Sequence, residues 1–170
     1  AYSVQVVGTV AYVADYYDGL QILDVSNPNA VTRLGGYNTL GYAYEVQVVG
    51  NAAYVADRTT GLQVLDVSNP DTVTHLGSYD TSGYAWDVQV VGSVAYLADG
   101  YSGLQILDVS NPNAVTSLGE YNTMGYARGV QVVGSVAYVA DRDSLEILDV
   151  SDPEAATRLG GFDPLDDALD

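Results

Sequence analysis

The chain has 170 residues, enough for one ordinary domain with a buried core. It carries 22 acidic residues against five arginines and no lysine, which gives a formal net charge of −17. A charge of this sign repels the phosphates of nucleic acids and of anionic lipids, so the composition argues against both as partners. We also expect no membrane insertion, because no apolar run approaches the ~20 residues of a membrane-spanning helix.

The chain contains no cysteine, which excludes thiol catalysis, thiolate metal sites and disulfides. An acidic surface without lysine remains solvated where salt screening is strong, as it often does in proteins outside the cell. The composition therefore favours an extracellular or cell-surface location.

From its first residue the chain is a tandem repeat. Copies of 42 residues begin at Ala1, Ala43 and Ala85, a fourth runs over 127–163, and an acidic tail covers 164–170. The first copy matches the second at 29 of 42 positions and the third at 33 of 42, so the register is fixed. The fourth copy lacks the glycine found at 19, 61 and 103, and terminal repeats are commonly atypical. We treat 1–170 as a single domain.

Each copy contains short β-prone runs separated by turn-forming residues. In the second copy the runs are 46–49, 53–56, 62–67 and 73–77. They are apolar on both faces, so both faces of each small sheet must be covered. Four strands in about 40 to 45 residues is the period of a propeller blade. The sequence therefore predicts an all-β fold, a β-propeller with four four-stranded blades of 42 residues per chain.

Several strings recur at fixed offsets in these copies. The first copy reads Ala-Tyr-Val-Ala-Asp at 11–15, Gly-Leu-Gln-Ile-Leu-Asp-Val-Ser-Asn-Pro at 19–28 and Leu-Gly-Gly-Tyr at 34–37. This pattern resembles the LVIVD repeat, a propeller repeat of bacterial and archaeal surface or secreted proteins. The resemblance covers residue 1 to about Phe162 and implies the fold, but no shared activity.

The number of copies leaves the closure of the ring open, because propellers usually have four to eight blades. The alternatives are a closed four-bladed ring, a homodimer that completes an eight-bladed ring, and a piece of a longer chain. Near-identical blades favour the homodimer, since an interface between chains can reuse the contact between neighbouring blades.

Residues that are constant among the copies are interpreted as framework. We expect Asp15, Asp57, Asp99 and Asp141 to accept N–H bonds within the turn that follows the second strand. Asp24 and its equivalents precede Val-Ser and are expected to organise the Asn-Pro turn. The alternative, a calcium site, lacks the D-x-[DN]-x-[DN]-G loop. Gln5 and its equivalents either line a central channel or form an internal ladder, which we favour.

Residues that vary among the copies cluster in the link into the first strand and in the loop between the second and third strands. Because successive strands of a blade run in opposite directions, both connections are expected on the same side of the propeller. Exposed Tyr, Trp and Arg are typical of binding hot spots, although loops also vary neutrally. The candidate binding face comprises Tyr2, Tyr16, Tyr17, Tyr44, Glu45, Arg58, Trp86, Asp87, Tyr101, Arg128 and Arg142.

The sequence predicts no catalytic residues, no metal ligands and no cofactor. The single histidine, His75, is expected on an outer strand facing solvent. Among the many acids, Glu45 and Asp87 would be the pair for a glycan-acting enzyme. We favour instead a non-catalytic surface module that binds a protein or glycan ligand or assembles with itself, with a structural spacer or lattice component as the alternative.

Overall fold

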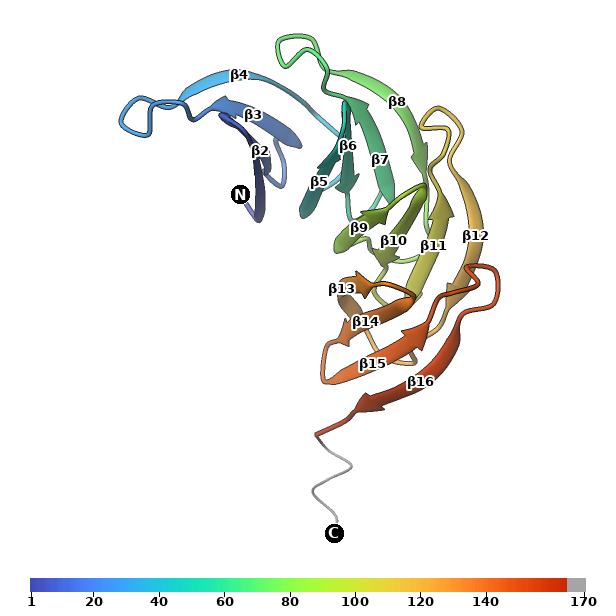
Figure 1. Cartoon of the computed structure of the whole chain (residues 1–170). Coiled ribbons are helices and arrows are strands. Elements are labelled where there is room, and N and C mark those ends of the chain that lie inside the picture. The colour runs from blue at the N-terminus through green and yellow to red at the C-terminus, as the bar shows by residue number, and fades with distance from the viewer. Residues whose placement is uncertain (165–170) are drawn as a thin grey trace.

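The structure is a computed structural model that describes residues 1–164. The described residues form four four-stranded antiparallel sheets in an arc, each with its strands in sequence order, which confirms the predicted propeller fold (Figure 1). No described residue belongs to a helix long and apolar enough to cross a membrane.

Each sheet is one blade and holds one copy of the repeat. Blade 1 contains β1 (Ser3–Val7), β2 (Val10–Ala14), β3 (Leu20–Asp24) and β4 (Thr32–Tyr37). Blade 2 contains β5 (Glu45–Val49), β6 (Ala52–Ala56), β7 (Leu62–Asp66) and β8 (Thr74–Tyr79). Blade 3 contains β9 (Asp87–Val91), β10 (Val94–Ala98), β11 (Leu104–Asp108) and β12 (Thr116–Tyr121). Blade 4 contains β13 (Ala127–Val133), β14 (Val136–Asp141), β15 (Ser144–Asp149) and β16 (Thr157–Phe162).

Short turns join the strands of a blade, and a β-bulge recurs at one position of every blade. Gly8 and its equivalents adopt positive φ in the tight turn between the first two strands, a conformation that glycine adopts without strain. The pairing of the outer two strands shifts register at the same offset in every blade, between Ile22 and Leu23 in blade 1. Such a bulge increases the local twist.

Aspartates at the end of the third strand cap the next turn as predicted. The backbone N–H of Ser26 donates to Asp24 Oδ1 at 2.8 Å, and the same bond recurs in every blade. In the fourth copy the missing glycine leaves a two-residue connection, Arg142-Asp143, between paired Asp141 and Ser144.

The core lies between blades rather than within them. One cluster joins Tyr12, Leu20 and Ile22 of blade 1 to Val46 and Leu65 of blade 2. Equivalent clusters join blade 2 to blade 3 and blade 3 to blade 4. Each blade therefore has a forward face, which covers the next blade, and a backward face, which covers the previous one. This explains why the β-prone runs are apolar on both sides.

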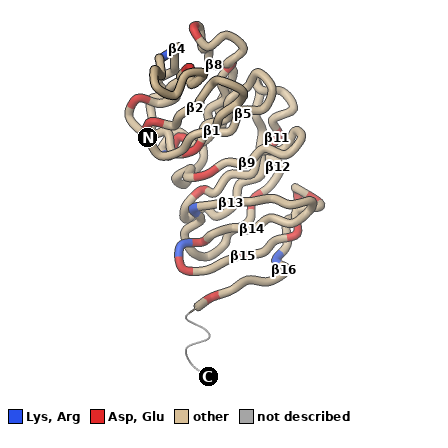
Figure 2. The backbone as a smooth tube through the Cα atoms, turned by 60° about the vertical axis from the view of Figure 1, so that its left-hand side comes forward, with Lys and Arg blue, Asp and Glu red and all other residues tan. Residues whose placement is uncertain are grey.

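The four blades form an arc that is open on one side, with β1 and β16, the first and last strands, on its two outermost blades (Figure 1). The alternative of a closed ring within one chain is therefore not what the structure shows. Of the expected acidic tail at 164–170, residues 165–170 lie outside the described residues. Acidic positions are spread along the whole arc, whereas basic ones are few (Figure 2).

Candidate binding face

The two variable connections meet at one edge of each blade. Because Ser3 pairs with Ala14, Tyr2 lies beside the turn that begins at Asp15. The link and the turn of neighbouring blades are also tied together by the backbone, since Tyr16 bridges to Ala43. The same bridge joins Arg58 to Ala85 and Gly100 to Ala127. The predicted gathering of these connections on one side of the arc is therefore what the structure shows.

Aromatic rings from these connections form a continuous row across the arc, which we call the aromatic strip. Its rings are those of Tyr17, Tyr42, Tyr16, Tyr2, Tyr44, Trp86, Tyr126 and Tyr101. Neighbouring centroids lie between 4.4 Å, as for Tyr2 and Tyr44, and 5.9 Å, as for Trp86 and Tyr126. The indole N–H of Trp86 donates to the Tyr126 hydroxyl at 3.1 Å. Burial and a hydrogen bond with Tyr2 raise the pKa of Tyr44 to about 12, so its hydroxyl remains protonated.

Two arginines lie over the centre of the strip. The guanidinium carbon of Arg58 is 5.3 Å from the Trp86 ring centroid, and that of Arg128 is 5.1 Å from it. Arg58 also approaches the rings of Tyr42, Tyr44 and Tyr84. Cations within about 6 Å of a ring centroid are attracted by its π electrons, and this leaves the N–H groups at the edge of the guanidinium to bind a ligand.

Neither arginine forms an ion pair with the described residues. Among residues 1–164, ion pairs involve the N-terminus, Arg142 and Arg158, but neither Arg58 nor Arg128. The Nε of Arg58 is buried and has no hydrogen-bond partner. Since buried polar groups are normally paired, this N–H is an unsatisfied donor in the middle of the strip.

The backbone of Arg58 supports a role for its side chain. Arg58 has a φ of 36°, in the left-handed region, and Tyr16 and Arg142 at the same repeat offset have positive φ as well. The third copy has Gly100 at this offset, where a left-handed φ costs least. A non-glycine residue in this conformation lowers the stability of the fold by about 1–2 kcal/mol. Such strained residues are found preferentially at functional sites.

The strip ends beside a hollow at the fourth blade. It has a volume of about 790 Å³ and is lined by Tyr101, Tyr126, Arg142, Arg158 and Phe162, among others. Met124, also on this lining, is 96% exposed. The hollow is the concave part of the candidate face.

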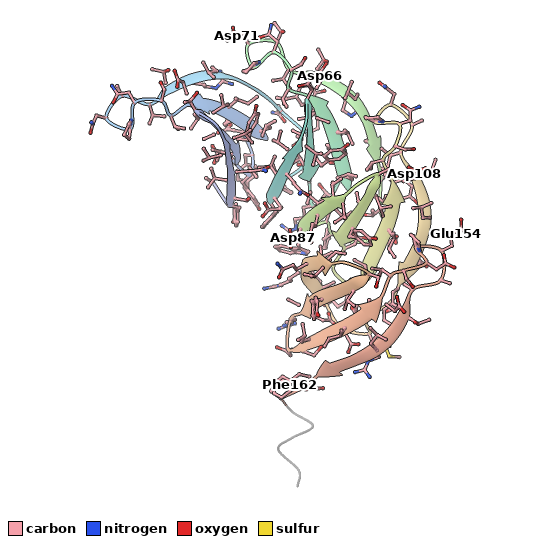
Figure 3. All side chains as sticks on the ribbon, in the orientation of Figure 1. Asp66, Asp71, Asp87, Asp108, Glu154 and Phe162 are labelled. Carbon is pink, nitrogen blue, oxygen red and sulfur yellow. The ribbon has the colours of Figure 1, made fainter. Side chains whose placement is uncertain are left out.

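Glu45 and Asp87 have a different role from the aromatic residues. Glu45 accepts the hydroxyl hydrogen of Ser3, and Asp87 Oδ2 accepts the backbone N–H of Val130 at 2.8 Å, so each joins two blades. Asp87 lies on the inner side of the arc (Figure 3). Burial raises the pKa of both carboxyl groups, and the charge of Asp87 contributes to the shift at Glu45.

Of the predicted face, the strip brings together Tyr2, Tyr16, Tyr17, Tyr44 and Trp86. Tyr101 lies at its far end, and Arg58 and Arg128 lie over it. Arg142 instead forms an exposed ion pair with Asp143 at 3.8 Å. Sequence reasoning missed Tyr42, Tyr84 and Tyr126, because this tyrosine is identical in three copies and only variable positions were selected.

One framework prediction is wrong in its partners. The Asp57 carboxylate does not accept the N–H groups of the turn that follows it: it accepts the Thr39 hydroxyl at 2.6 Å, the Gly41 N–H at 3.0 Å and the Thr60 hydroxyl of that turn. Thr39 and Gly41 belong to the link before blade 2. Asp99 repeats this latch, and burial raises its pKa to about 6.

The inner glutamines form the expected ladder and also line the inner side of the arc. Gln47 accepts the backbone N–H of Val90 in the next blade, and its Nε2 donates to Val90 O at 3.5 Å. The four glutamines at this offset line a shallow hollow of about 390 Å³.

Residues that could serve metal binding or imidazole chemistry do not gather on the strip. Within residues 1–164, no group of three or more His, Cys, Asp or Glu side chains could hold a metal ion. His75 is exposed on β8, as predicted, and contacts Gln63 at 3.2 Å.

The repeat itself identifies the family. The model of the LVIVD repeat matches residues 1–39, 40–81, 82–123 and 124–161. The chain belongs to the LVIVD-repeat family. No protein of curated function matches this LVIVD-repeat chain.

Solved structures similar to the chain share its fold at low sequence identity. The computationally designed Ika8 protein has a TM-score of 0.74 at 8% identity, over 94% of this chain and 48% of its own. The computationally designed Ika4 protein has a TM-score of 0.74 at 7% identity, over 88% of this chain and 91% of its own. The Cps50 (Swd1) β-propeller domain of Myceliophteria thermophila has a TM-score of 0.70 at 12% identity, over 91% and 55%. The LVIVD-repeat chain thus spans about half the length of two of these structures.

Proposed function

We propose that the chain is a non-catalytic binding module, extracellular or at a cell surface, whose ligand contacts the aromatic strip. The observation that carries this proposal is the pair Arg58 and Arg128 over Trp86, without a carboxylate partner in residues 1–164 of a chain with a net charge of −17. Because the chain has 22 acidic residues and only five arginines, an arginine without an acidic partner is unexpected. Their unpaired N–H groups therefore favour a ligand that brings the negative charge.

The strip favours a glycan that carries a carboxylate. A guanidinium whose face lies on a ring presents paired N–H donors that match a carboxylate. Tyr2, Tyr17 and Tyr101 are more than half exposed and offer both ring faces and hydroxyl groups, which suits the alternating apolar and polar surfaces of sugars. The overall negative charge disfavours densely charged polyanions, so we propose isolated carboxylates such as those of uronic acids.

Binding is favoured over glycan hydrolysis by the positions of Glu45 and Asp87. Both carboxylates accept hydrogen bonds that join neighbouring blades, which is a framework role. A hydrolase remains testable on the same ligands: the proposal predicts that incubation with the protein releases no shorter sugar, and release that is lost in Glu45→Gln would contradict it.

The test uses Trp86, the only tryptophan of the chain, as a reporter inside the site. Uronic-acid-containing oligosaccharides, neutral oligosaccharides of equal length and acidic peptides are titrated while tryptophan fluorescence is recorded. We expect saturable change with the uronic acid series alone. Arg58→Gln and Arg128→Gln should each weaken binding by about tenfold or more, as loss of a charge-assisted hydrogen bond does.

The matched control is Arg33→Gln, because Arg33 bonds Gln21 on the outer strands, away from the strip. This variant should bind as the wild type does. No fluorescence change with any sugar, or full affinity in both Arg58→Gln and Arg128→Gln, would overturn the proposal. Binding of the acidic peptides alone would assign the strip to a protein ligand instead.

We also propose that the chain assembles with a copy of itself to complete an eight-bladed ring. The uncovered faces of the two end blades favour this second role, which does not depend on the ligand.

A further inference from the structure

The backward face of blade 1 is exposed although its residues are those of a buried seam. Val4 and Val6 are 60% and 56% exposed, whereas Val46 and Val48 at the same offsets in blade 2 are 2% and 9% exposed. The difference has no cause in the residues, which are identical. It arises because nothing in the described chain covers β1.

The forward face of blade 4 is uncovered in the same way. Tyr138 is 37% exposed, while Tyr96 at the same offset in blade 3 is 6% exposed. Leu159 and Phe162 on β16 are also more than half exposed, and Phe162 lies at the end of the arc (Figure 3). Apolar surface of this extent at both ends of one molecule marks interaction sites.

The two free faces carry, at matching repeat offsets, the polar groups that meet at each seam. Inside the arc, Gln89 of blade 3 bonds both backbone groups of Val132 in blade 4. Gln131 is the next glutamine of this ladder and faces the open side, and the equivalent of Val132 that it would meet is Val6 of another blade 1. Arg142 has the same repeat offset as Tyr16, whose backbone bridges to Ala43 of the next blade. The backbone of Arg142 would therefore bridge to the equivalent Ala1 of another copy.

Gly160 gives an independent indication that a blade fits there. A Cβ on Gly35, Gly77 or Gly119 would lie 2.0 to 2.5 Å from the carbonyl of the Pro turn in the next blade. A Cβ on Gly160, at the same offset, would have nothing within 4 Å. Blade 4 therefore has the glycine that each seam requires, at a place where the described chain puts no neighbour.

From these matches we infer that two copies of the chain join head to tail, with the forward face of each blade 4 covered by blade 1 of the other copy. Two arcs of four blades give eight, within the four to eight that propellers use, whereas three arcs would exceed it. A head-to-tail contact forms a closed ring when its rotation returns to the start, as a two-fold axis does.

The strip itself lies within one chain, and the proposed ligand binding at Trp86 therefore does not require the ring.

Charge opposes this assembly and gives it a recognisable salt dependence. Each copy carries a net charge of −17, so the two repel each other, and screening reduces the repulsion. The apolar faces do not lose attraction in salt. We therefore expect the dimer to tighten as sodium chloride is raised.

The test is the mass of the whole chain in solution by light scattering, over a range of protein and salt concentrations. We expect twice 17.9 kDa for the wild type and for Val91→Glu, in which an exposed valine outside the seam gains the same charge. Val6→Glu and Gly160→Ala should give the single-chain mass with an unchanged circular dichroism spectrum. These two substitutions lie on opposite faces, at sites that are open in one arc, so neither should prevent folding.

The pairing is tested by crosslinking, which is specific because the chain has no cysteine. A short bis-maleimide should link two chains of the double variant Val6→Cys, Gln131→Cys covalently, whereas Val6→Cys alone should give no covalently linked dimer. A wild type that stays monomeric at all salt concentrations, a mass that grows beyond two chains, or a dimer unaffected by Val6→Glu would each overturn the inference. Sugar binding depends on the strip within one chain and is measured independently of the mass, so the two proposals fail separately.

Discussion

The seam between blades 3 and 4 and the free face of blade 4 are built from the same repeat offsets, yet they differ in burial. Leu104 is fully buried in the seam, whereas Leu145, its equivalent in blade 4, is only half-buried. The difference shows that the core of a blade is formed jointly with its neighbouring blades. Each apolar residue obtains most of its stabilisation from the neighbouring blade, and the same residue contributes little where that neighbour is missing. The comparison can be tested at matched offsets, in the Val6→Glu background that we expect to be monomeric.

The largest expected difference comes from truncating a core leucine. Leu104→Ala should lower the free energy of unfolding by about 2–5 kcal/mol, because it leaves a cavity in the seam. Leu145→Ala should cost less than half as much, since its side chain is already partly hydrated. Urea unfolding followed by circular dichroism measures both, and equal costs would show that the free face is covered in solution.

The next difference concerns the close approach at the Pro turns. Gly77→Ala should destabilise the chain by roughly 1–3 kcal/mol, because its Cβ would lie 2.4 Å from the Pro112 carbonyl oxygen. Gly160→Ala should change the stability of the single arc by less than about 0.5 kcal/mol. Thermal melts of the two variants give the comparison directly.

A smaller difference is expected for the glutamine ladder. Gln89→Ala removes two hydrogen bonds to Val132 and should cost about 1–2 kcal/mol, including the backbone groups left unpaired. Gln131→Ala should cost almost nothing in the monomer. Amide hydrogen exchange at Val132 should quicken in the first variant only.

The smallest expected effect is on pH dependence. Burial raises the pKa of Asp99 from 3.8 to about 6, so the folded state binds this proton more tightly than the unfolded chain does. Its contribution to stability is full below about pH 3.8 and is lost as the pH rises through about 6. The free energy of unfolding should therefore increase when the pH falls from 7 to 5, and Asp99→Asn should flatten that increase.

Asp108→Asn is the control for this measurement. Hydrogen bonds from Ser110 lower the pKa of Asp108, so its contribution has the opposite sign and is lost only as the pH falls below 3.8. Asp108→Asn should leave the slope between pH 7 and 5 in place. A slope of wild-type size in Asp99→Asn would show that the latch does not titrate in this range.

The fold was predictable from the sequence because every blade repeats the same offsets. A strand pattern that is weak in one copy is supported by its recurrence in the other three. The position of the variable connections on one side also followed from strand alternation. The partners of Asp57 did not follow, because Thr39 and Gly41 precede it by 18 and 16 residues and no local pattern links them. The convergence of Arg58 and Arg128 on Trp86 depends on how three blades pack, which one copy of the repeat does not encode.

The openness of the arc could not be read from the sequence for a physical reason. Val4 and Val46 are the same residue in the same local string, and only a neighbour in space distinguishes them. The repeat offset of Gly160 predicts a neighbouring Pro turn, but no described residue lies within 4 Å of a Cβ placed there.

The sharing of each cluster between consecutive blades also has a consequence for how the molecule comes apart. A protein whose units contact only their neighbours behaves as a one-dimensional array, in which terminal units are held from one side and inner units from two. In the single arc, unfolding should then proceed as fraying from β1 and β16 inward, and blades 2 and 3 should exchange their amide hydrogens last.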